Sequence, residues 1–227
     1  EDLALIGDVL MGYDDLDPDM RVRSRPNLAE TAEAEPPVTP RVAFIRTPAW
    51  DQADGDVKGG FEELAGHLGE NAEEIGLPGN FDGAVDLHQT IMEADIARNF
   101  HDDYERGKEK ISSVLREMIE RGQKVLAVDY NRAIDQRLYL NGLLGQIFDV
   151  FDAIITPGAT GEAPVGLEST GSPIFCTIWT LCGVPAVTLP LLEGSNGMPI
   201  GVQLIGPKGD DARLLRTARW LEGAVSE

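Results

Sequence analysis

Three short apolar runs lie in the last third of the chain, and Gly or Pro residues bound each of them. The runs are Ala153–Thr156, Pro185–Leu192 and Ile200–Ile205. Their length and their bounding residues are typical of buried β-strands. An earlier run, Arg41–Arg46, ends at Thr47-Pro48 and predicts a fourth strand.

A long Gly-, Pro- and Ser-rich stretch, Gly158–Pro173, separates the first two of the late strands. Apolar residues at helical spacing follow it, at Phe175, Ile178, Trp179 and Cys182. A helix at this place would end at Gly183. Strands joined by a long loop and a helix indicate the core of an α/β sheet, with the loop lying where ligands usually bind.

Helical periodicity accounts for most of the remaining chain. The expected helices are Leu3–Leu10, Val57–His67, Asp86–Asn99, one that runs from Asp103 to about Glu120, Tyr130–Phe148 and one that follows Asp210. Two stretches lack this pattern. Ala29–Pro40 is polar and Pro-rich and is typical of an exposed linker, and Asn71–Gly83 is typical of irregular chain with a turn.

The charge of the chain argues against two classes of partner. Asp and Glu number 39 against 19 Lys and Arg, which gives a formal net charge of −20. A protein that binds nucleic acid or an anionic membrane needs a basic surface, so we expect neither partner. A solvated surface that keeps the protein soluble explains the acidic excess, and a saline-adapted source is the alternative.

The sequence also predicts a cytoplasmic location. No window reaches the roughly 18 consecutive apolar residues of a membrane span, and no signal peptide opens the chain. The two cysteines, Cys176 and Cys182, would lie on different faces of a helix, which opposes a disulfide between them. Both stand among large apolar residues, as buried structural thiols do.

Ordered motifs in the second half of the chain resemble one known family. They read AxxxR…FDAIITP…AP…WTLCGVPAVTLP…MPIGVQLIGPKGDD, from Ala133 to Asp211. This run is similar to the C-terminal half of amidase signature hydrolases, although many members carry Asn at the position of Thr180. The opening residues, from Glu1 to Asp14, look like the family segment that directly follows its catalytic serines.

The resemblance implies a fold and a reaction. The fold would be α/β, the C-terminal part of an amidase-signature-like mixed twisted β-sheet surrounded by helices. Residues 1–227 would form the C-terminal part of a single amidase domain, with a helix and linker over residues 1–40 and the α/β core over 41–227. The intact protein would hydrolyse the C–N bond of a small-molecule carboxamide to an acid plus ammonia or an amine, with water and without a metal or organic cofactor.

No residue of this chain matches the family's catalytic Ser, bridging Ser and Lys, so we expect the chain itself to be inactive. A Ser–Lys mechanism needs a lysine whose pKa is lowered by burial, but the five lysines stand in charged or Gly-flanked contexts. No G-x-S-x-G motif occurs. The three histidines lack the spacing of metal ligands, and the Asp-rich stretch after Gly12 lacks the Gly and Glu of an EF-hand loop.

The resemblance leaves a substrate-facing wall as the role of this chain. It implies substrate-binding roles for Arg137, in the AxxxR motif, and for Trp179 and Thr180. The residues themselves leave an alternative open, because Trp179 could be a core aromatic and Arg137 a structural partner of an acid. Other hypotheses are the A subunit of an amidotransferase, an allophanate-type hydrolase, or a non-catalytic scaffold or oligomerisation module. A divided core would favour self-association into a homo-oligomer.

Overall fold

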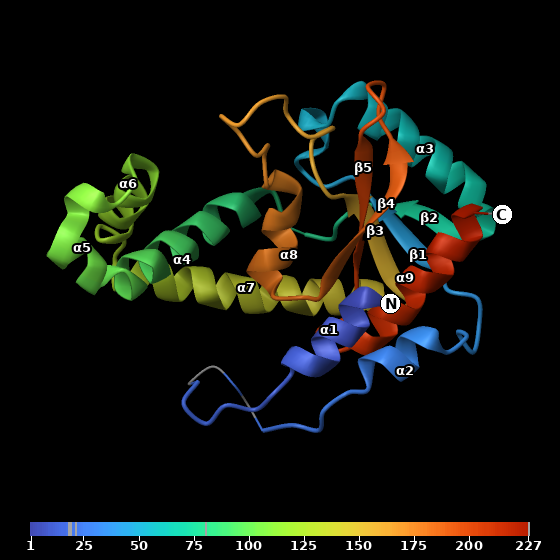
Figure 1. The fold of residues 1–227 in the computed structure, drawn as a ribbon, viewed down its shortest axis with the longest axis horizontal. Helices are drawn as coiled ribbons and strands as arrows, with labels where there is room; N and C mark the ends of the chain where they lie inside the picture. Colours follow the sequence, from blue (N-terminus) through green and yellow to red (C-terminus); the bar gives the residue numbers. More distant parts are fainter. Residues whose placement is uncertain (18–19, 21, 80, 227) are drawn as a thin grey trace. The chain divides into compact units, whose positions relative to one another are not determined.

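A computed structural model describes residues 1–17, 20, 22–79 and 81–226 (Figure 1). The chain divides into two compact units, and each is described by itself. The sheet unit comprises Glu1–Leu77, Gly145–Phe175 and Gly183–Glu227, and the helical unit comprises Pro78–Leu144 and Cys176–Cys182.

The strands of the sheet unit form one mixed sheet. Among the described residues it has five strands in the order β2-β1-β3-β5-β4. Their bounds are β1 Val42–Ile45, β2 Ala72–Ile75, β3 Ala153–Pro157, β4 Ala186–Glu193 and β5 Pro199–Ile205. Strand β1 pairs in parallel with β2 and β3, whereas β5 pairs antiparallel with β3 and β4. The mixed sheet and its four expected strands are confirmed, with ends shifted by at most one residue.

Two helices cover one face of this sheet, α3 (Gly55–Leu68) and α9 (Asp211–Ser226). Both carry apolar residues at helical spacing, such as Val57, Phe61 and Leu64 on α3, and these pack on every second residue of the strands. The rings of Phe44 and Phe61 stack with centroids 5.7 Å apart. All four residues of β1 are buried, which explains why an apolar run without alternation predicted a central strand.

The stretch Ala29–Pro40, expected to be an exposed linker, is helical in its first part. Helix α2 (Leu28–Glu33) follows α1 (Asp2–Leu10) and packs against α9. The carboxylate of Asp8 on α1 accepts the N–H groups of Leu28 and Ala29 at 3.0 and 2.9 Å, and Asn27 caps the same helix end. The expectation was wrong because it passed over the local cap at Asn27, and because the further bonds to Asp8 come from a residue twenty positions before Leu28, which the local pattern does not show.

The stretch Asn71–Gly83, expected to be irregular, contains strand β2. Its sequence Ala72-Glu73-Glu74-Ile75 is half charged, but it lies at the edge of the sheet and pairs with β1 alone. Its two glutamates pair with arginines that flank β1: Arg41 lies 3.1 Å from Glu73 and Arg46 lies 2.9 Å from Glu74. Backbone pairing and these ion pairs therefore specify a strand that has little apolar signal.

The helical unit is built from α4, α5, α6, α8 and most of α7. Their bounds are α4 Ala84–Asn99, α5 His101–Gly107, α6 Ser113–Gly122, α7 Ala127–Phe148 and α8 Thr177–Cys182. Helix α4 packs against both α6 and α8, and α8 ends where Gly183 adopts a φ of 63°. The remaining short 3₁₀ turns are Trp50–Gln52, Gly69–Asn71, Phe81–Gly83, Lys108–Lys110 and Ile174–Cys176.

One helix expected in this unit is divided into two. The periodicity from Asp103 to Glu120 predicted one continuous helix, but α5 ends at Gly107 and α6 begins after Ser112. The Ser112 hydroxyl accepts the N–H of Leu115 at 3.3 Å, which is a helix N-cap. A serine that caps the second helix thus overrides the apolar periodicity of the stretch.

Candidate functional site

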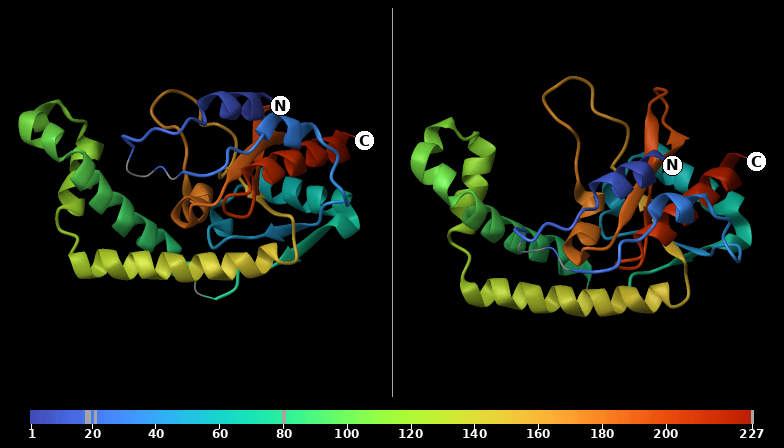
Figure 2. Two further views of the ribbon diagram at one scale, coloured as in Figure 1. Left: turned by 90° about the horizontal axis from the view of Figure 1, so that it is seen from below. Right: turned by 60° about the horizontal axis from the view of Figure 1, so that its bottom comes forward.

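The stretch Gly158–Pro173, here called the long loop, leaves the sheet at the end of β3 (Figure 2). The N–H of Gly158 donates to the carbonyl of Gly201 on β5 at 3.0 Å. A Cβ on Gly158 would lie 3.3 Å from the same oxygen, so the absence of a side chain permits this close pairing. The loop therefore begins directly beside β5.

Three polar side chains lie next to one another at this end of the sheet. Thr156 pairs in register with Gln203, and Thr188 pairs with Gln203 from the other side. A sequence neighbour of each belongs to the apolar core, so the alternation of a strand points these three side chains to the opposite face. We call Thr156, Gln203 and Thr188 the polar row.

The polar row offers hydrogen-bonding groups without an activated nucleophile. Thr156 is fully buried, and within the described part of the chain its hydroxyl has no hydrogen-bond partner. Gln203 is 5% exposed, and Thr188 is exposed beside Gly201, where a Cβ would lie 2.5 Å from the Thr188 methyl carbon. A buried hydroxyl without a partner costs free energy, so the row is a place where a further polar group would be stabilised.

Two of the residues expected to bind substrate lie on α8 of the helical unit. Trp179 is 1% exposed, and its indole N–H has no hydrogen-bond partner in the described ranges. The next residue, Thr180, is exposed. Helix α8 packs against α4.

The third expected residue, Arg137, lies on α7 and is half-buried. No ion pair or hydrogen bond in the described part of the chain joins Arg137 to Trp179 or Thr180. All three belong to the helical unit, whereas the polar row belongs to the sheet unit. The substrate-binding roles of Arg137, Trp179 and Thr180 stay a prediction.

The lysines of the chain are not buried in a way that would make one of them a base. Lys58 is half-buried, with its ammonium 3.4 Å from the carbonyl of Asp51, and Lys108, Lys110, Lys124 and Lys208 are exposed. A base that must approach neutrality needs a desolvated position. Among the residues that the structure describes, no group of three His, Cys, Asp or Glu side chains is arranged to hold a metal ion.

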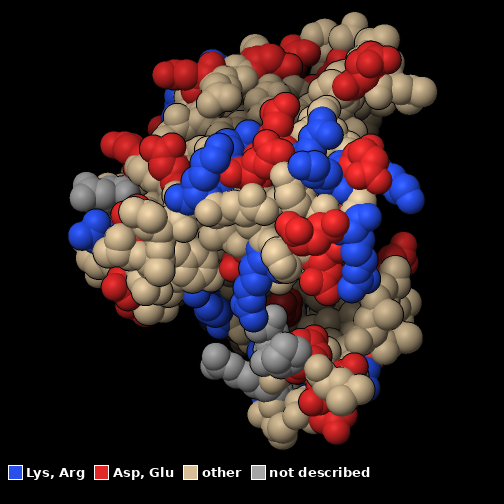
Figure 3. Space-filling model, turned by 90° about the vertical axis from the view of Figure 1, so that its left-hand side faces the viewer, with Lys and Arg blue, Asp and Glu red and all other residues tan. Residues whose placement is uncertain are grey.

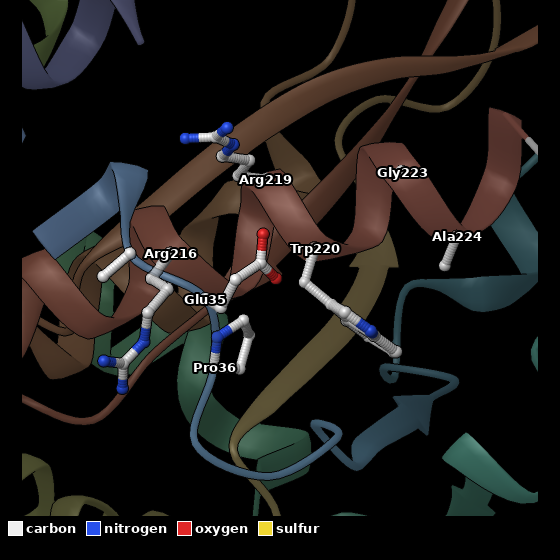
Figure 4. A pocket seen from close by; sticks show the side chains of 8 residues that line it. Glu35, Pro36, Arg216, Arg219, Trp220, Gly223 and Ala224 are labelled. Atoms are coloured by element: carbon white, nitrogen blue, oxygen red, sulfur yellow. The ribbon is translucent and has the colours of Figure 1, made fainter.

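A pocket of about 350 Å³ lies between α9 and the chain after α2. Figure 4 shows Glu35, Arg216 and Arg219 among the side chains that line the pocket, with Trp220 directed to the other side. Its described lining residues include no Ser, Thr, Cys or Lys that could act as a nucleophile, so we do not place the reaction there.

A longer groove of about 640 Å³ follows the outer strand of the sheet. It is lined by the first residues of α1, by Val187–Pro190 of β4 and by α9. Strand β4 lies at the end of the strand order, next to β5. Its outer edge therefore has backbone groups that could pair with a further strand.

Charged groups of both signs are interspersed on one face of the molecule. On the face drawn in Figure 3, Lys and Arg side chains alternate with Asp and Glu, unlike the continuous basic patch of a nucleic-acid-binding protein.

Within the described residues, no helix combines the length and the apolar character that crossing a membrane would require.

The polar row was not identified from the sequence, although a signal for it was present. Each member interrupts an apolar run, as Thr156 does in AIIT, Thr188 in AVTL and Gln203 in GVQLI. A polar residue inside a buried strand must find a partner. That rule would have selected Thr156 and Gln203, whereas Thr188 is exposed, and only the sheet order shows that the three are neighbours.

Comparison with known proteins extends over nearly the whole chain. A model of the amidase family matches residues 1–215. Among curated relatives, the 2-amino-5-chloromuconic acid deaminase of Comamonas testosteroni is 25% identical over 204 residues, which are 82% of this chain and 44% of that protein. The 6-aminohexanoate-cyclic-dimer hydrolase of Paenarthrobacter ureafaciens is 28% identical, over 61% of this chain and 33% of that protein. The A subunit of the glutamyl-tRNA(Gln) amidotransferase of Endomicrobium trichonymphae is also 28% identical, over 69% of this chain and 40% of that protein.

A solved structure shows the same fold. The 6-aminohexanoate cyclic dimer hydrolase complexed with substrate superposes with a TM-score of 0.79 at 23% identity, over 100% of this chain and 54% of that one. The chain thus spans about half the length, or less, of the relatives that it matches.

Proposed function

The chain belongs to the amidase signature family, and from this premise we propose that it is the C-terminal portion of an amidase. The complete enzyme adds water across a carboxamide C–N bond and releases a carboxylic acid and ammonia or an amine. The observation that carries the proposal is the extent of the match: residues 1–215 fit the family, while the chain covers only 44% of a curated relative.

The reaction requires groups beyond those found in this chain. Amide hydrolysis needs an activated nucleophile and hydrogen-bond donors for the oxyanion that forms on attack. The exposed or half-buried lysines offer no desolvated base. We therefore assign the nucleophilic Ser, the bridging Ser and the Lys of the family to the other portion of the enzyme.

The part that we assign to this chain is a wall of the substrate site. The long loop and the polar row supply backbone and hydroxyl groups that could orient a carboxamide. In the helical unit, taken by itself, Trp179 would supply a substrate with apolar area and one N–H, and Arg137 and Thr180 would supply polar contacts. The buried hydroxyl of Thr156 and the buried indole N–H of Trp179, both without a partner in the described ranges, support such a role.

The test compares this chain with the longer reading frame that would contain it. Both proteins are incubated with a fluorophosphonate serine probe and with a panel of aliphatic and aryl amides. We expect the longer protein to be labelled and active and the 227-residue chain to be silent, because it lacks a nucleophile paired with a base. Labelling of any serine in the shorter chain would contradict this assignment.

A second candidate is the ammonia-releasing component of an amidotransferase. Relatives with this name include the protein from Endomicrobium trichonymphae, at 28% identity. Such a component would release ammonia for a partner protein, so its amidase activity would rise when the partner is added.

A third candidate, a non-catalytic scaffold, predicts that the upstream reading frame contains neither the Lys segment nor the Gly/Ser-rich serine block. Light scattering would then test the expected homo-oligomer.

A further inference from the structure

Three segments of the sheet unit meet around the turn between β4 and β5. They are the start of α3, the first residues of the long loop and the turn itself, Gly194–Met198. Asp56 on α3 accepts hydrogen bonds from the N–H and the hydroxyl of Ser195. The N–H of Asp54 donates to the carbonyl of Thr160 in the long loop at 2.8 Å. The turn is therefore bound to α3, and α3 is bound to the loop.

Glu162 joins the long loop directly to this turn. One carboxylate oxygen accepts the backbone N–H groups of Asn196 and Met198, both at 3.1 Å. The other oxygen accepts the side-chain amide of Asn196 at 2.7 Å. The hydrogen bond from the Asn196 side chain is the main reason why the pKa of Glu162 lies below its ordinary value, and the two backbone bonds lower it further. The carboxylate is therefore ionised at neutral pH. Three hydrogen bonds leave this side chain little rotational freedom.

Two glycines make the close approach of the carboxylates feasible. A Cβ on Gly194 would lie 2.3 Å from a carboxylate oxygen of Glu162, and a Cβ on Gly161 would lie 2.1 Å from a carboxylate oxygen of Asp54. Real Cβ atoms are not found so close to another heavy atom, so a side chain at either position would push the carboxylate away. The backbone is thus shaped around both acids.

The long loop is exposed to solvent after Glu162. Residues 163–173 are exposed without interruption, and Figure 2 shows this part as an open arc. Val165 and Leu167 in the arc have exposures of 105% and 100%. Two hydrogen bonds of the arc, from the N–H groups of Gly171 and Ile174, go to serines two residues earlier. The arc is therefore held at both ends, by Glu162 where it leaves the sheet and by Ile174 and Phe175, which pack in the apolar core, where it returns.

We propose that Glu162 is a positioning residue that fixes the direction in which the long loop leaves the sheet, and thereby the placement of the substrate wall. This inference rests on the proposed function, since it takes the arc as part of that wall. In this role Glu162 acts through Asn196 and Met198, which lie on the turn between two strands and so transmit the rigidity of the sheet.

The first test uses the 227-residue chain and needs no catalysis. Backbone ¹⁵N relaxation is measured for Glu162→Ala, for Glu162→Gln and for the matched control Glu168→Ala, which removes an exposed carboxylate from the arc. We expect Glu162→Ala to lower the order parameters from Thr160 to Val165 below about 0.6, while Glu168→Ala changes none of them.

The conservative variant distinguishes positioning from charge. Gln at position 162 can still accept both backbone N–H groups through its one oxygen, and the Asn196 amide can turn to accept its new N–H₂. Glu162→Gln should therefore keep the order parameters near those of the unchanged chain. The inference is overturned if Glu162→Ala affects Asn196 and Met198 alone, or if Glu168→Ala has the same effect as Glu162→Ala.

The second test uses the longer protein and an amide that it cleaves. Glu162→Ala should raise KM roughly 10-fold with kcat within about twofold, since a displaced wall weakens binding without removing a reacting group. Glu162→Gln should restore KM. Unchanged KM in Glu162→Ala would overturn the role in substrate placement. Absence of amidase activity in the unchanged longer protein would instead overturn the proposed function, and the relaxation result would stand by itself.

Discussion

In the sheet unit the rings of Phe44, Trp50 and Phe61 pack against one another with centroids 5.6 to 6.5 Å apart. In the helical unit, by comparison, a charged residue is buried where α4 packs against α6. Glu93 on α4 is 5% exposed and accepts the guanidinium of Arg121 on α6 at 2.7 Å. The sheet unit also has ion pairs, but a pair such as Arg46–Glu74 is half-exposed. One unit buries apolar surface, and the other also buries a carboxylate.

This difference determines how each unit responds to its surroundings. Burial of apolar area does not depend on pH. A buried carboxylate, in contrast, is stable only when it is paired with a cation, and it loses its charge when the pH falls. The helical unit has further polar links, from the Tyr130 hydroxyl to Asp95 at 3.1 Å and from the Tyr104 hydroxyl to Glu120 at 3.0 Å. We therefore expect acid to weaken the α4–α6 contact itself, whereas in the sheet unit acid would act on carboxylates outside the apolar core, such as Glu162.

The largest effect that we expect in the helical unit comes from Trp179→Ala. Trp179 is 1% exposed on the short helix α8, which packs against α4. Removal of a buried Trp destabilises a protein by roughly 3–5 kcal/mol, and we expect that loss in thermal unfolding followed by circular dichroism.

The variant Trp179→Phe separates packing from substrate contact. Phe keeps most of the apolar volume and removes the indole N–H, which has no partner in the described ranges. It should therefore unfold close to the unchanged protein. A large stability loss in Trp179→Phe would mean that the N–H has a structural partner. In the longer protein, an altered preference among acyl chain lengths in Trp179→Phe would support the substrate role.

The sequence predicted the sheet unit well because its elements are specified by apolar burial. Phe44, Ile155 and Leu204 stand in runs whose length and bounding residues indicate strands, and all three are buried. Two of the elements that the sequence did not predict are supported by contacts with distant residues. Helix α2 receives the bonds to Asp8, and β2 pairs its backbone with β1 beside ion pairs to Arg41 and Arg46. Polar contacts between distant residues leave no periodic signal.

The candidate site was less predictable than the fold. Trp179, Thr180 and Arg137 were selected through the family resemblance, and the structure places them in the helical unit without a contact that tests their role. Thr156, Gln203 and Thr188 were not selected, since each looks like one more strand residue in the sequence. Glu162 was inside a loop that was singled out, but its bonds to Asn196 and Met198 depend on the fold.

A second, smaller effect is expected from Gly122→Ala at the contact of α6 with α4. A Cβ at this position would lie 1.9 Å from the carbonyl oxygen of Glu93, so the two helices would have to separate. Overpacking of this kind costs about 1–3 kcal/mol, which urea denaturation would measure.

The matched control for that variant is Gly142→Ala on α7. Nothing lies within 4 Å of a Cβ built at Gly142, and the position is exposed inside a helix. Replacement of a helical glycine by alanine should stabilise the protein by about 0.5–1 kcal/mol. If both variants changed stability by the same amount and sign, helix propensity rather than the α4–α6 contact would explain the result.

The smallest effect concerns the ionisation of Glu93. The hydrogen bond from Arg121 is the main reason why the pKa of Glu93 lies below its ordinary value of 4.5. Gln89 adds a second bond at 3.0 Å. Because the folded-state pKa is lowered, the ionised carboxylate contributes stability above the pKa of the unfolded chain. That contribution is lost as the pH falls through the lower folded-state pKa.

Glu93→Gln should therefore reduce stability at pH 7 by about 1–2 kcal/mol, since a charge-assisted bond to Arg121 becomes a neutral one. The difference between Glu93→Gln and the unchanged chain should shrink as the pH falls below 4.5, measured by urea denaturation at pH 7 and pH 4. Asp102→Asn is the matched control, because the Asp102–Arg106 pair is exposed on α5 of the same unit and should contribute little. If the difference in unfolding free energy between Glu93→Gln and the unchanged chain did not depend on pH, ionisation of Glu93 would not contribute to stability. The contrast between an apolar sheet unit and a charge-dependent helical unit would then fail.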